Sequence, residues 1–262
     1  MNNLSNILTN NIAAVIPAAG KATRLPNTKG SKEVIPVGYI NTDDQNSVMD
    51  KPVCMHLLEK LRHAGIQKAH MVIREEKWDI PQTLGSGDCV DMDIAYQMLR
   101  VSHGTAYTID QAYSFVKNNI VALGFPDILI TPDDAYVQIL SFLEKSNADV
   151  VLGLFPADKP KKCDMVEMND NFYVKNIIIK PEKTKLTLTW GIAVWKPSFT
   201  KFLHDFLLNH QYKSSDPEMF IGNVIQQAIS QGLIVKAKQV SNSAFLDIGT
   251  PDDLERAIKL FR

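Results

Sequence analysis

The sequence predicts an α/β fold built on a doubly wound, mixed β-sheet with an inserted antiparallel sub-region. Two observations favour this class. In the first half of the 262-residue chain, short apolar runs alternate with stretches of helical apolar spacing, as in crossover units that form a parallel sheet covered on both faces. After about residue 148 several strand patterns follow one another with polar turns between them, which indicates antiparallel pairing.

The first half begins with a strand at 12–17, where IAAVIP is a nearly continuous apolar run typical of a strand buried on both faces. A helix is expected from Pro52 to Ala64, because apolar residues recur there at helical spacing and Gly65 follows as a stop signal. The same alternation predicts strands at 68–73, 93–99 and 119–124, and helices at 104–117 and 133–146.

The second half is expected to carry the added antiparallel region and the closing helices. A polar turn such as Asn169-Asp170-Asn171 separates neighbouring strand patterns. The expected strands are 149–155, 163–168, 172–179, 187–195 and 233–240, and the expected helices are 197–209, 217–231 and a last one from Pro251. Because no repeat or linker interrupts the chain, residues 1–262 are predicted to form one domain with halves of about 1–148 and 149–262.

Composition excludes several function classes. The chain has 28 Lys and Arg against 29 Asp and Glu, so we expect neither a nucleic-acid partner nor an anionic membrane surface. Its three cysteines are scattered and outside any metal-binding spacing. The first eleven residues lack the charged and apolar regions of a secretory signal, and no apolar run reaches the roughly 20 residues of a membrane span. We therefore expect a cytoplasmic protein.

The segment 16–38, IPAAGKATRLPNTKGSKEVIPVG, is the most informative stretch of the chain. It leaves the first expected strand through small residues and then presents Arg24 and Lys32. Small residues allow backbone N–H groups to approach an anion, and two cations on one loop neutralise a polyphosphate. The segment therefore predicts a site for a nucleoside triphosphate. The alternative is an ordinary strand-to-helix loop with two solvated cations.

This segment resembles the signature of the sugar nucleotidyltransferases of the glucose-1-phosphate thymidylyltransferase type. The matching residues are Gly20, Thr23, Arg24, Leu25, Pro26, Thr28, Lys32, Pro36 and Val37, whereas Ala22 and Ser31 depart from the pattern. The resemblance implies a Rossmann-like fold of the nucleotide-diphospho-sugar transferase type, with a nucleotide-binding first half and a sugar-phosphate-binding second half. It assigns catalysis to Arg24 and Lys32, and nucleotide binding to Ala18, Ala19, Gly20, Thr23, Arg24 and Glu33.

A second segment, from Tyr96 to Val116, is similar to the part of the family that lies against the base. Gly104 and Thr105 match it and are assigned to nucleotide binding, while Leu99 stands where the family has a glutamine that reads the base. An amide reads a base edge through its paired donor and acceptor, so the resemblance does not identify the base. The alternative for Gly104 is a plain turn glycine.

Two aspartates, Asp127 and Asp247, match the family positions that hold magnesium, and the resemblance also assigns catalysis to Asp127. Asp127 follows the strand expected at 119–124, and an acid at such a strand end faces the crevice where open α/β sheets bind ligands. Asp247 lies in AFLDIGTPDDL, which matches the family closely. The alternative is that Asp127, Asp133 and Asp134 are only loop and helix-capping acids, and that Thr250 and Asp253 form a capping box.

The match is weaker at the positions that bind the sugar phosphate. The resemblance assigns substrate binding to Asp164, Lys180 and Gly191, with Lys180 also catalytic. Ile179 replaces a glutamate that bonds sugar hydroxyls in the family, and an apolar side chain accepts no hydrogen bond. The acceptor is therefore expected to differ from ordinary glucose 1-phosphate. The alternative for Lys180 is a solvated lysine at a strand end.

The resemblance implies condensation of a nucleoside triphosphate with a sugar 1-phosphate, assisted by Mg²⁺, to give a nucleotide sugar and pyrophosphate. Two alternatives stay open. A nucleotide-sugar glycosyltransferase would use the D-x-D spacing of Asp91 and Asp93 for a metal, and a nucleotide-sugar-binding protein would keep the pocket without turnover. The sequence does not identify the base or the sugar, and a homo-oligomer is left open.

Overall fold

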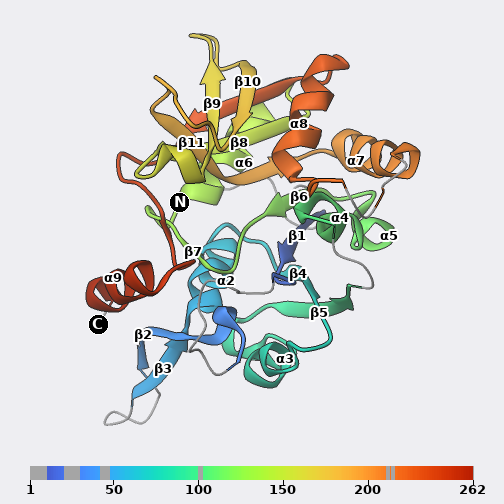
Figure 1. Cartoon of the computed structure of the whole chain (residues 1–262). Helices are drawn as coiled ribbons and strands as arrows, with labels where there is room; N and C mark the ends of the chain where they lie inside the picture. The colour runs from blue at the N-terminus through green and yellow to red at the C-terminus, as the bar shows by residue number, and fades with distance from the viewer. Residues whose placement is uncertain are drawn as a thin grey trace.

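One mixed sheet organises the computed structural model, which describes residues 11–20, 30–41, 48–99, 103–210, 213 and 216–261 (Figure 1). Within these residues the sheet has nine strands in the order β10-β9-β11-β6-β1-β4-β5, with β8 beside β11 and β12 beside β8. The strands are β1 (Ile12–Pro17), β4 (Lys68–Ile73), β5 (Asp93–Met98), β6 (Ile120–Leu123), β8 (Val150–Pro156), β9 (Asp164–Met168), β10 (Val174–Ile179), β11 (Leu188–Trp195) and β12 (Val235–Gln239).

Strand direction divides the sheet as the sequence predicts. β1 pairs in parallel with β4 and β6, and β4 pairs in parallel with β5. β11 runs antiparallel to β6, β8 and β9, and β9 forms an antiparallel pair with β10. The β9–β10 pair stands at one end of the molecule in Figure 1. The predicted mixed α/β sheet with an added antiparallel region is confirmed.

Helices cover both faces of the sheet because successive side chains of a strand point to opposite faces. In β1, Ile12, Ala14 and Ile16 contribute to one core cluster, while Ala13 and Val15 contribute to the other. α2 (Val53–His63), α3 (Asp79–Leu84) and α6 (Ala135–Lys145) pack in the first cluster; α4 (Thr105–Asp110), α5 (Tyr113–Val116), α7 (Pro197–Asn209) and α8 (Ile221–Ser230) pack in the second.

A third, smaller core links the end of the chain to its beginning. Two short strands, β7 (Ile128–Leu129) and β13 (Leu246–Asp247), pair with each other, and α9 (Pro251–Phe261) packs near the hairpin of β2 (Pro36–Asn41) and β3 (Val48–Pro52). The buried side chains of this core include Val37, Leu129, Ile248 and Ala257. The β7–β13 pair thus places the segment around Asp247 next to the residues that follow β6.

Several expected boundaries are wrong, for local reasons. The helix expected at 104–117 is divided into α4 and α5. The helix expected at 217–231 begins only at Ile221, because Phe220 is extended and Met219 forms backbone hydrogen bonds with His103 and Ala106. The β2–β3 and β7–β13 pairs, α3 and three 3₁₀ turns were not expected; the turns are η1 (Lys32–Val34), η2 (Asp88–Val90) and η3 (Pro160–Lys162). None of the helices in the described part of the chain has the length and apolar character needed to cross a bilayer.

Candidate active site

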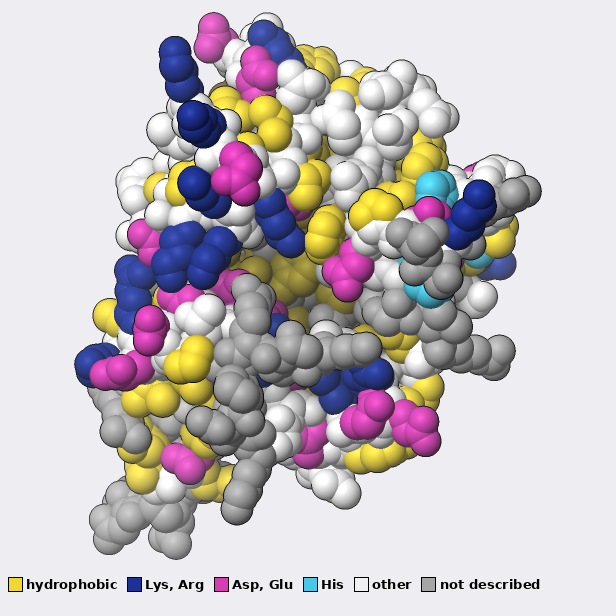
Figure 2. Space-filling model, in the orientation of Figure 1, with side chains coloured by type: hydrophobic (Ala, Val, Ile, Leu, Met, Phe, Trp, Pro, Cys, Tyr) yellow, Lys and Arg dark blue, Asp and Glu magenta, His cyan; other side chains and the backbone are white. Residues whose placement is uncertain are grey.

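A cavity of about 410 Å³ is lined by the segments that follow β6, β8 and β10 and by the starts of α8 and α9. Figure 2 shows a hollow on this face, with apolar side chains inside and lysine and arginine side chains beside it. The charged residues of the wall are Asp127, Asp158, Lys159, Lys161, Lys162, Asp164, Lys180, Asp247 and Asp253, and its aromatic residues are Phe125, Trp190, Phe220 and Phe245. Its size is within the usual range of small-molecule sites.

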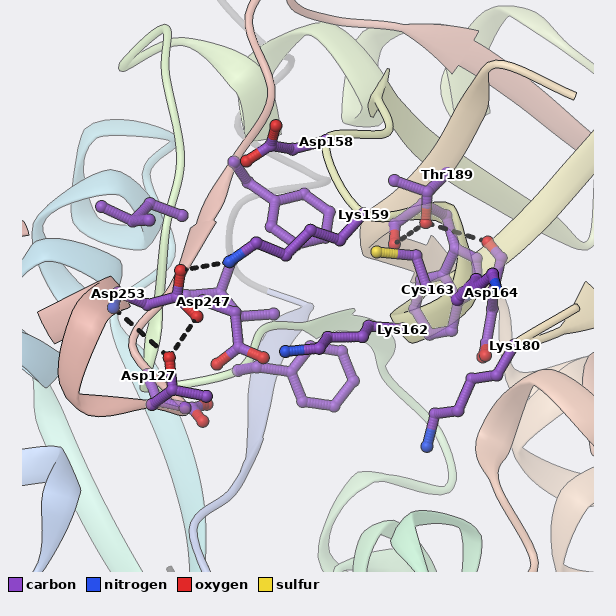
Figure 3. A pocket seen from close by; sticks show the side chains of 18 of the residues that line it. Asp127, Asp158, Lys159, Lys162, Cys163, Asp164, Lys180, Thr189, Asp247 and Asp253 are labelled. Carbon is purple, nitrogen blue, oxygen red and sulfur yellow. Dashed lines mark hydrogen bonds and ion pairs between the residues drawn. The ribbon is translucent and has the colours of Figure 1, made fainter. Parts of the chain in front are cut away.

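Asp127 and Asp247, which lie far apart in the sequence, meet in this cavity. The β7–β13 pair places Asp247 opposite Ile128, and the backbone N–H of Ile248 donates to the carbonyl of Asp127 at 3.1 Å. Both carboxylates face the cavity in Figure 3. The backbone ladder therefore fixes the separation of the two acids.

Lys32 places a positive charge beside Asp127. Its ammonium forms an ion pair with the Asp127 carboxylate, and both side chains are largely buried. Burial lowers the pKa of Lys32, but Asp127, helped by Glu33 and Asp247, raises it above its ordinary value. Lys32 is therefore charged at neutral pH and lies beside the acids.

Two further contacts hold the segment that carries Lys32. The backbone N–H and hydroxyl of Ser31 donate to Asp79 at 2.5 and 2.6 Å. Lys77 donates to both carboxylate oxygens of Glu33 at 2.6 and 2.7 Å, in a pair that is almost fully buried. Burial raises the pKa of Glu33 and lowers that of Lys77, in each case against the opposing effect of the partner. The start of α3 thus anchors η1.

Glu33, which the resemblance assigns to nucleotide binding, has its carboxylate held inside the protein. Its side chain is only 1% exposed, and Lys77 occupies both of its oxygens. A carboxylate held in this way has no free face for a base. Its ion pair with Lys77 connects the backbone beside Lys32 to the segment before α3.

Asp164 and Lys180 lie at the other end of the cavity (Figure 3). Burial raises the pKa of Asp164 to about 6, although Lys180 opposes the shift. The start of α8 closes over this carboxylate, since a Cβ atom on Gly222 would lie 2.7 Å from Asp164 Oδ2. The Lys180 ammonium lies 3.9 Å from the centre of the Phe220 ring, a cation–π contact that fixes its direction.

Three small residues assigned to ligand binding also have packing roles. Gly104 has φ +105°, and a Cβ atom there would lie 2.7 Å from the backbone nitrogen of Met219. Thr105 lines the cavity and accepts a hydrogen bond from the backbone N–H of Ile221 at 2.9 Å. Gly191 is buried outside the cavity wall, where a Cβ atom would lie 3.0 Å from the ring of Phe245. Gly104 and Gly191 thus permit the close packing that shapes the wall.

The other residues assigned to nucleotide binding follow β1. Ala18 and Ala19 are buried just after β1, and Gly20 is exposed with open space around it. Thr23 and Arg24 lie outside the described residues.

The acids of the D-x-D spacing lie outside the cavity, and those near the start of α9 belong to a helix cap. Asp91 pairs with Arg62, and neither Asp91 nor Asp93 belongs to the cavity wall. Thr250 caps the start of α9: the Asp253 N–H donates to Thr250 Oγ1 at 3.3 Å, and this hydroxyl donates to Asp253 Oδ2 at 2.7 Å, in place of the bond from the Thr250 backbone N–H that a capping box has. The cap explains Thr250 and Asp253 but not Asp247.

Four lysines and one acid were not identified from the sequence. Lys77 and Asp79 position η1, and no pattern signals that a charged residue forms a buried pair. Lys159, Lys161 and Lys162 line the cavity. Here the sequence does give a signal, because three lysines in four residues directly precede the strand expected at 163–168.

The paired acids fit a magnesium ion better than a structural transition metal. No group of three or more His, Cys, Asp or Glu side chains suited to a metal occurs in the part of the chain that is described. Mg²⁺ is commonly held by one or two carboxylates, with substrate phosphates and waters completing its octahedron. Asp127 and Asp247 provide such a partial set of oxygen ligands at the cavity wall.

Comparison with known proteins gives consistent matches over nearly the whole chain. A family model described as nucleotidyl transferase matches residues 13–262. The chain is 25% identical to the bifunctional protein GlmU of Methanococcus maripaludis, over 92% of the chain and 52% of that protein. It is 23% identical to the low-salt glycan biosynthesis nucleotidyltransferase Agl11 of Haloferax volcanii, over 94% of the chain and 65% of that protein.

Two further matches are of similar length to the chain. A glucose-1-phosphate thymidylyltransferase of Neisseria meningitidis is 24% identical over 93% of the chain and 80% of that protein. A solved structure from Bacillus anthracis, assigned as a glucose-1-phosphate thymidylyltransferase and bound to sucrose, has a TM-score of 0.79 at 20% identity, covering 96% of this chain and 95% of that one. By contrast, the chain spans between about half and two thirds of GlmU and Agl11.

Proposed function

The chain belongs to the nucleotidyl transferase family, and from this premise we propose that it condenses a nucleoside triphosphate with a sugar 1-phosphate. The products are a nucleotide sugar and pyrophosphate. Relatives named for glucose-1-phosphate thymidylyl transfer, together with GlmU and Agl11, support this class of reaction. The base and the sugar are not part of the proposal.

The proposed step is an in-line displacement at the α-phosphorus. An oxygen of the acceptor phosphate forms a bond to this phosphorus, while the bond to the oxygen that bridges the α- and β-phosphates breaks. The electron pair of that bond leaves with pyrophosphate. A phosphate monoester has its second pKa near about 6, so the nucleophile is already largely ionised at neutral pH and requires no general base.

What the protein must supply is placement and charge, because two polyanions repel each other. We assign the triphosphate to Lys32 and Arg24, with Ala18, Ala19, Gly20, Thr23, Gly104 and Thr105 on the nucleotide side, and the acceptor phosphate to Lys180. Asp164 is assigned to the acceptor's polar groups, and Gly191 acts on the acceptor side through packing. Asp127 and Asp247 would hold Mg²⁺, which when bound neutralises phosphate charge near the reacting phosphorus.

The meeting of Asp127 and Asp247 in one cavity carries this proposal. The sequence separates them widely, and the short β7–β13 ladder joins them. A helix cap accounts for neither residue. Lys32 beside Asp127 and Lys180 at the far end of the cavity provide cations on both sides of the pair, as a reaction between two phosphates requires.

The test is release of pyrophosphate by the purified protein in a panel of nucleoside triphosphates and sugar 1-phosphates with Mg²⁺. We expect one combination to give pyrophosphate and nucleotide sugar in equal amounts. Release of a nucleoside diphosphate from a nucleotide sugar would instead support the glycosyltransferase. Binding of a nucleotide sugar without turnover in any combination would overturn the enzymatic proposal in favour of a binding protein.

We also propose a cytoplasmic site of action. Cys54, Cys89 and Cys163 are all free thiols, which fits a reducing compartment. Location of the tagged protein in cell fractions would test this assignment.

A further inference from the structure

The lysines of the cavity wall fall into two groups. Lys159 is paired with Asp253 at 2.5 Å, and Lys161 with Glu182 at 3.5 Å. Lys162 and Lys180 line the same cavity, and neither has an ion pair with any residue that the structure describes. Two positive charges therefore face the cavity without an ion pair to a carboxylate of the described residues.

The short segment that carries Lys162 is attached firmly to its surroundings. Lys159 and the adjacent Asp158 form ion pairs with Asp253 and Arg256 of α9, the latter at 2.9 Å. The 3₁₀ turn η3 supplies a further hydrogen bond, from the Lys162 N–H to the carbonyl of Lys159 at 2.8 Å. These contacts fix the backbone from which the Lys162 side chain extends.

The side chain of Lys162 extends into the cavity. In Figure 3 its side chain points toward Asp247, and the side chain of Lys180 extends into the cavity further from the acids. The two lysines come from different segments, one between β8 and β9 and the other directly after β10. The space between them adjoins the pair of acids.

The charge of the acceptor matches two lysines rather than one. A phosphate monoester carries about −1.5 to −2 at neutral pH. Lys180 alone would leave much of this charge uncompensated in a partly apolar cavity, where an unpaired charge is costly. A second ammonium from a different segment would balance it and also fix the direction of the phosphate.

We propose that Lys162 and Lys180 hold the acceptor phosphate between them, so that Lys162 is a second ligand of the nucleophile. This inference rests on the proposed transfer reaction and extends it. It gives the lysine-rich segment 159–162 two tasks: Lys159 ties the segment to α9, and Lys162 binds substrate.

The test compares Lys162→Met with Lys162→Arg and with the control Lys183→Met, in which an exposed lysine outside the cavity wall is replaced. A hydrogen bond to a charged group contributes about 1.5–3 kcal/mol. Lys162→Met is therefore expected to reduce kcat/KM for the sugar phosphate about 10- to 100-fold and to change the KM for the nucleoside triphosphate less than about twofold. Lys162→Arg should recover most of the loss, and Lys183→Met should resemble wild type.

Two results would overturn the inference. One is a normal kcat/KM for the sugar phosphate in Lys162→Met; the other is an effect confined to the KM of the triphosphate, which would place Lys162 on the nucleotide instead. If the wild-type protein releases no pyrophosphate in any combination, the proposed reaction fails separately. Calorimetric titration with each sugar 1-phosphate of the panel then decides the role of Lys162. For the sugar phosphate that the wild-type protein binds, weaker binding to Lys162→Met than to Lys183→Met supports it, and equal binding contradicts it.

Discussion

The two ends of the cavity differ in how their charges are compensated. At the end that holds the acids, the protein supplies its own partners: Lys32 pairs with Asp127, and Lys77 pairs with Glu33 behind it. At the acceptor end, Lys180 contacts an aromatic ring, and burial outweighs the effect of Lys180 on Asp164. One end is thus held together by ion pairs, and the other presents charges to the cavity.

This difference indicates which end depends on a ligand. Removing charges from water costs several kcal/mol per ion unless a partner compensates. The buried pairs behind the acids meet this requirement within the protein, which fixes the acids and Lys32 before any substrate binds. The acceptor end would be compensated by the phosphate and polar groups of the substrate. Groups with shifted pKa values in a cavity are accordingly candidates for function.

The first test removes the buried Glu33–Lys77 ion pair, which lies behind Asp127 and Lys32, and has the largest expected effect. Lys77→Met would leave the buried carboxylate of Glu33 without its partner, which costs about 3–5 kcal/mol in comparable buried pairs. We expect the midpoint of thermal unfolding to fall by about 10 °C, because 1 kcal/mol corresponds to roughly 2–4 °C in a chain of this size. Circular dichroism during heating measures the change.

The control for this variant is an ion pair on the surface. Lys60 bonds to Asp133 at 2.5 Å, but the Asp133 side chain is 80% exposed, so Lys60→Met should cost at most about 1 kcal/mol. The double variant Glu33→Met/Lys77→Met removes both charges and should recover most of the lost stability. Equal destabilisation by Lys60→Met and Lys77→Met would show that burial does not distinguish the two pairs.

The second test concerns the acids themselves. Asp247→Asn keeps the shape of the side chain and removes one negative charge from the pair. We expect kcat to fall about 10²- to 10³-fold, as when one electrostatic group is removed from other active sites, and a higher Mg²⁺ concentration to be needed for half-maximal rate. Steady-state release of pyrophosphate at varied Mg²⁺ gives both values.

Asp252→Asn is the matched control, because this exposed acid lies in the first turn of α9, close in sequence to Asp247 but outside the cavity wall. It should retain normal turnover. Near-normal turnover of Asp247→Asn as well would remove the acid pair from the mechanism.

Features that are visible in a local stretch of sequence are the ones that the sequence predicts well. Strands such as β1 are continuous apolar runs because both of their faces are covered, and this property is visible locally. Asp127 and Asp247 were identified because each lies in a recognisable segment. The strands that join them, β7 and β13, have only two residues each, so no periodic pattern marks them.

The support behind the acids was not predictable, because it depends on pairs between distant charged residues. Glu33 lies in a segment that suggests contact with a ligand, yet its partner is 44 positions away and buried with it. Burial of a charge is decided by the folded structure, and local composition gives no sign of it. The lysine-rich segment 159–162 was visible in the sequence, but its attachment to α9 depends on the fold.

The last test has the smallest expected effect and addresses the acceptor end. Because burial raises the pKa of Asp164 from 3.8 to about 6, the native state binds more protons than the unfolded state between these values. The free energy of unfolding contributed by this group therefore falls as pH rises from about 4 to 6 and stays low above 6. Asp164→Asn removes the buried charge and should stabilise the protein above pH 6, on the order of 1 kcal/mol after allowance for partial exposure of the side chain.

Thermal unfolding of Asp164→Asn and wild type at pH 7.5 and pH 4 measures this effect. We expect the variant to unfold about 2–4 °C higher at pH 7.5 and the difference to shrink at pH 4, where Asp164 is protonated in the native state and partly protonated in the unfolded state. The control Asp170→Asn changes an exposed acid in the turn between β9 and β10 and should show no such dependence on pH. A lower unfolding temperature for Asp164→Asn at pH 7.5 would mean that the protein stabilises this carboxylate itself. The acceptor end would then resemble the acid end, and the distinction between them would be lost.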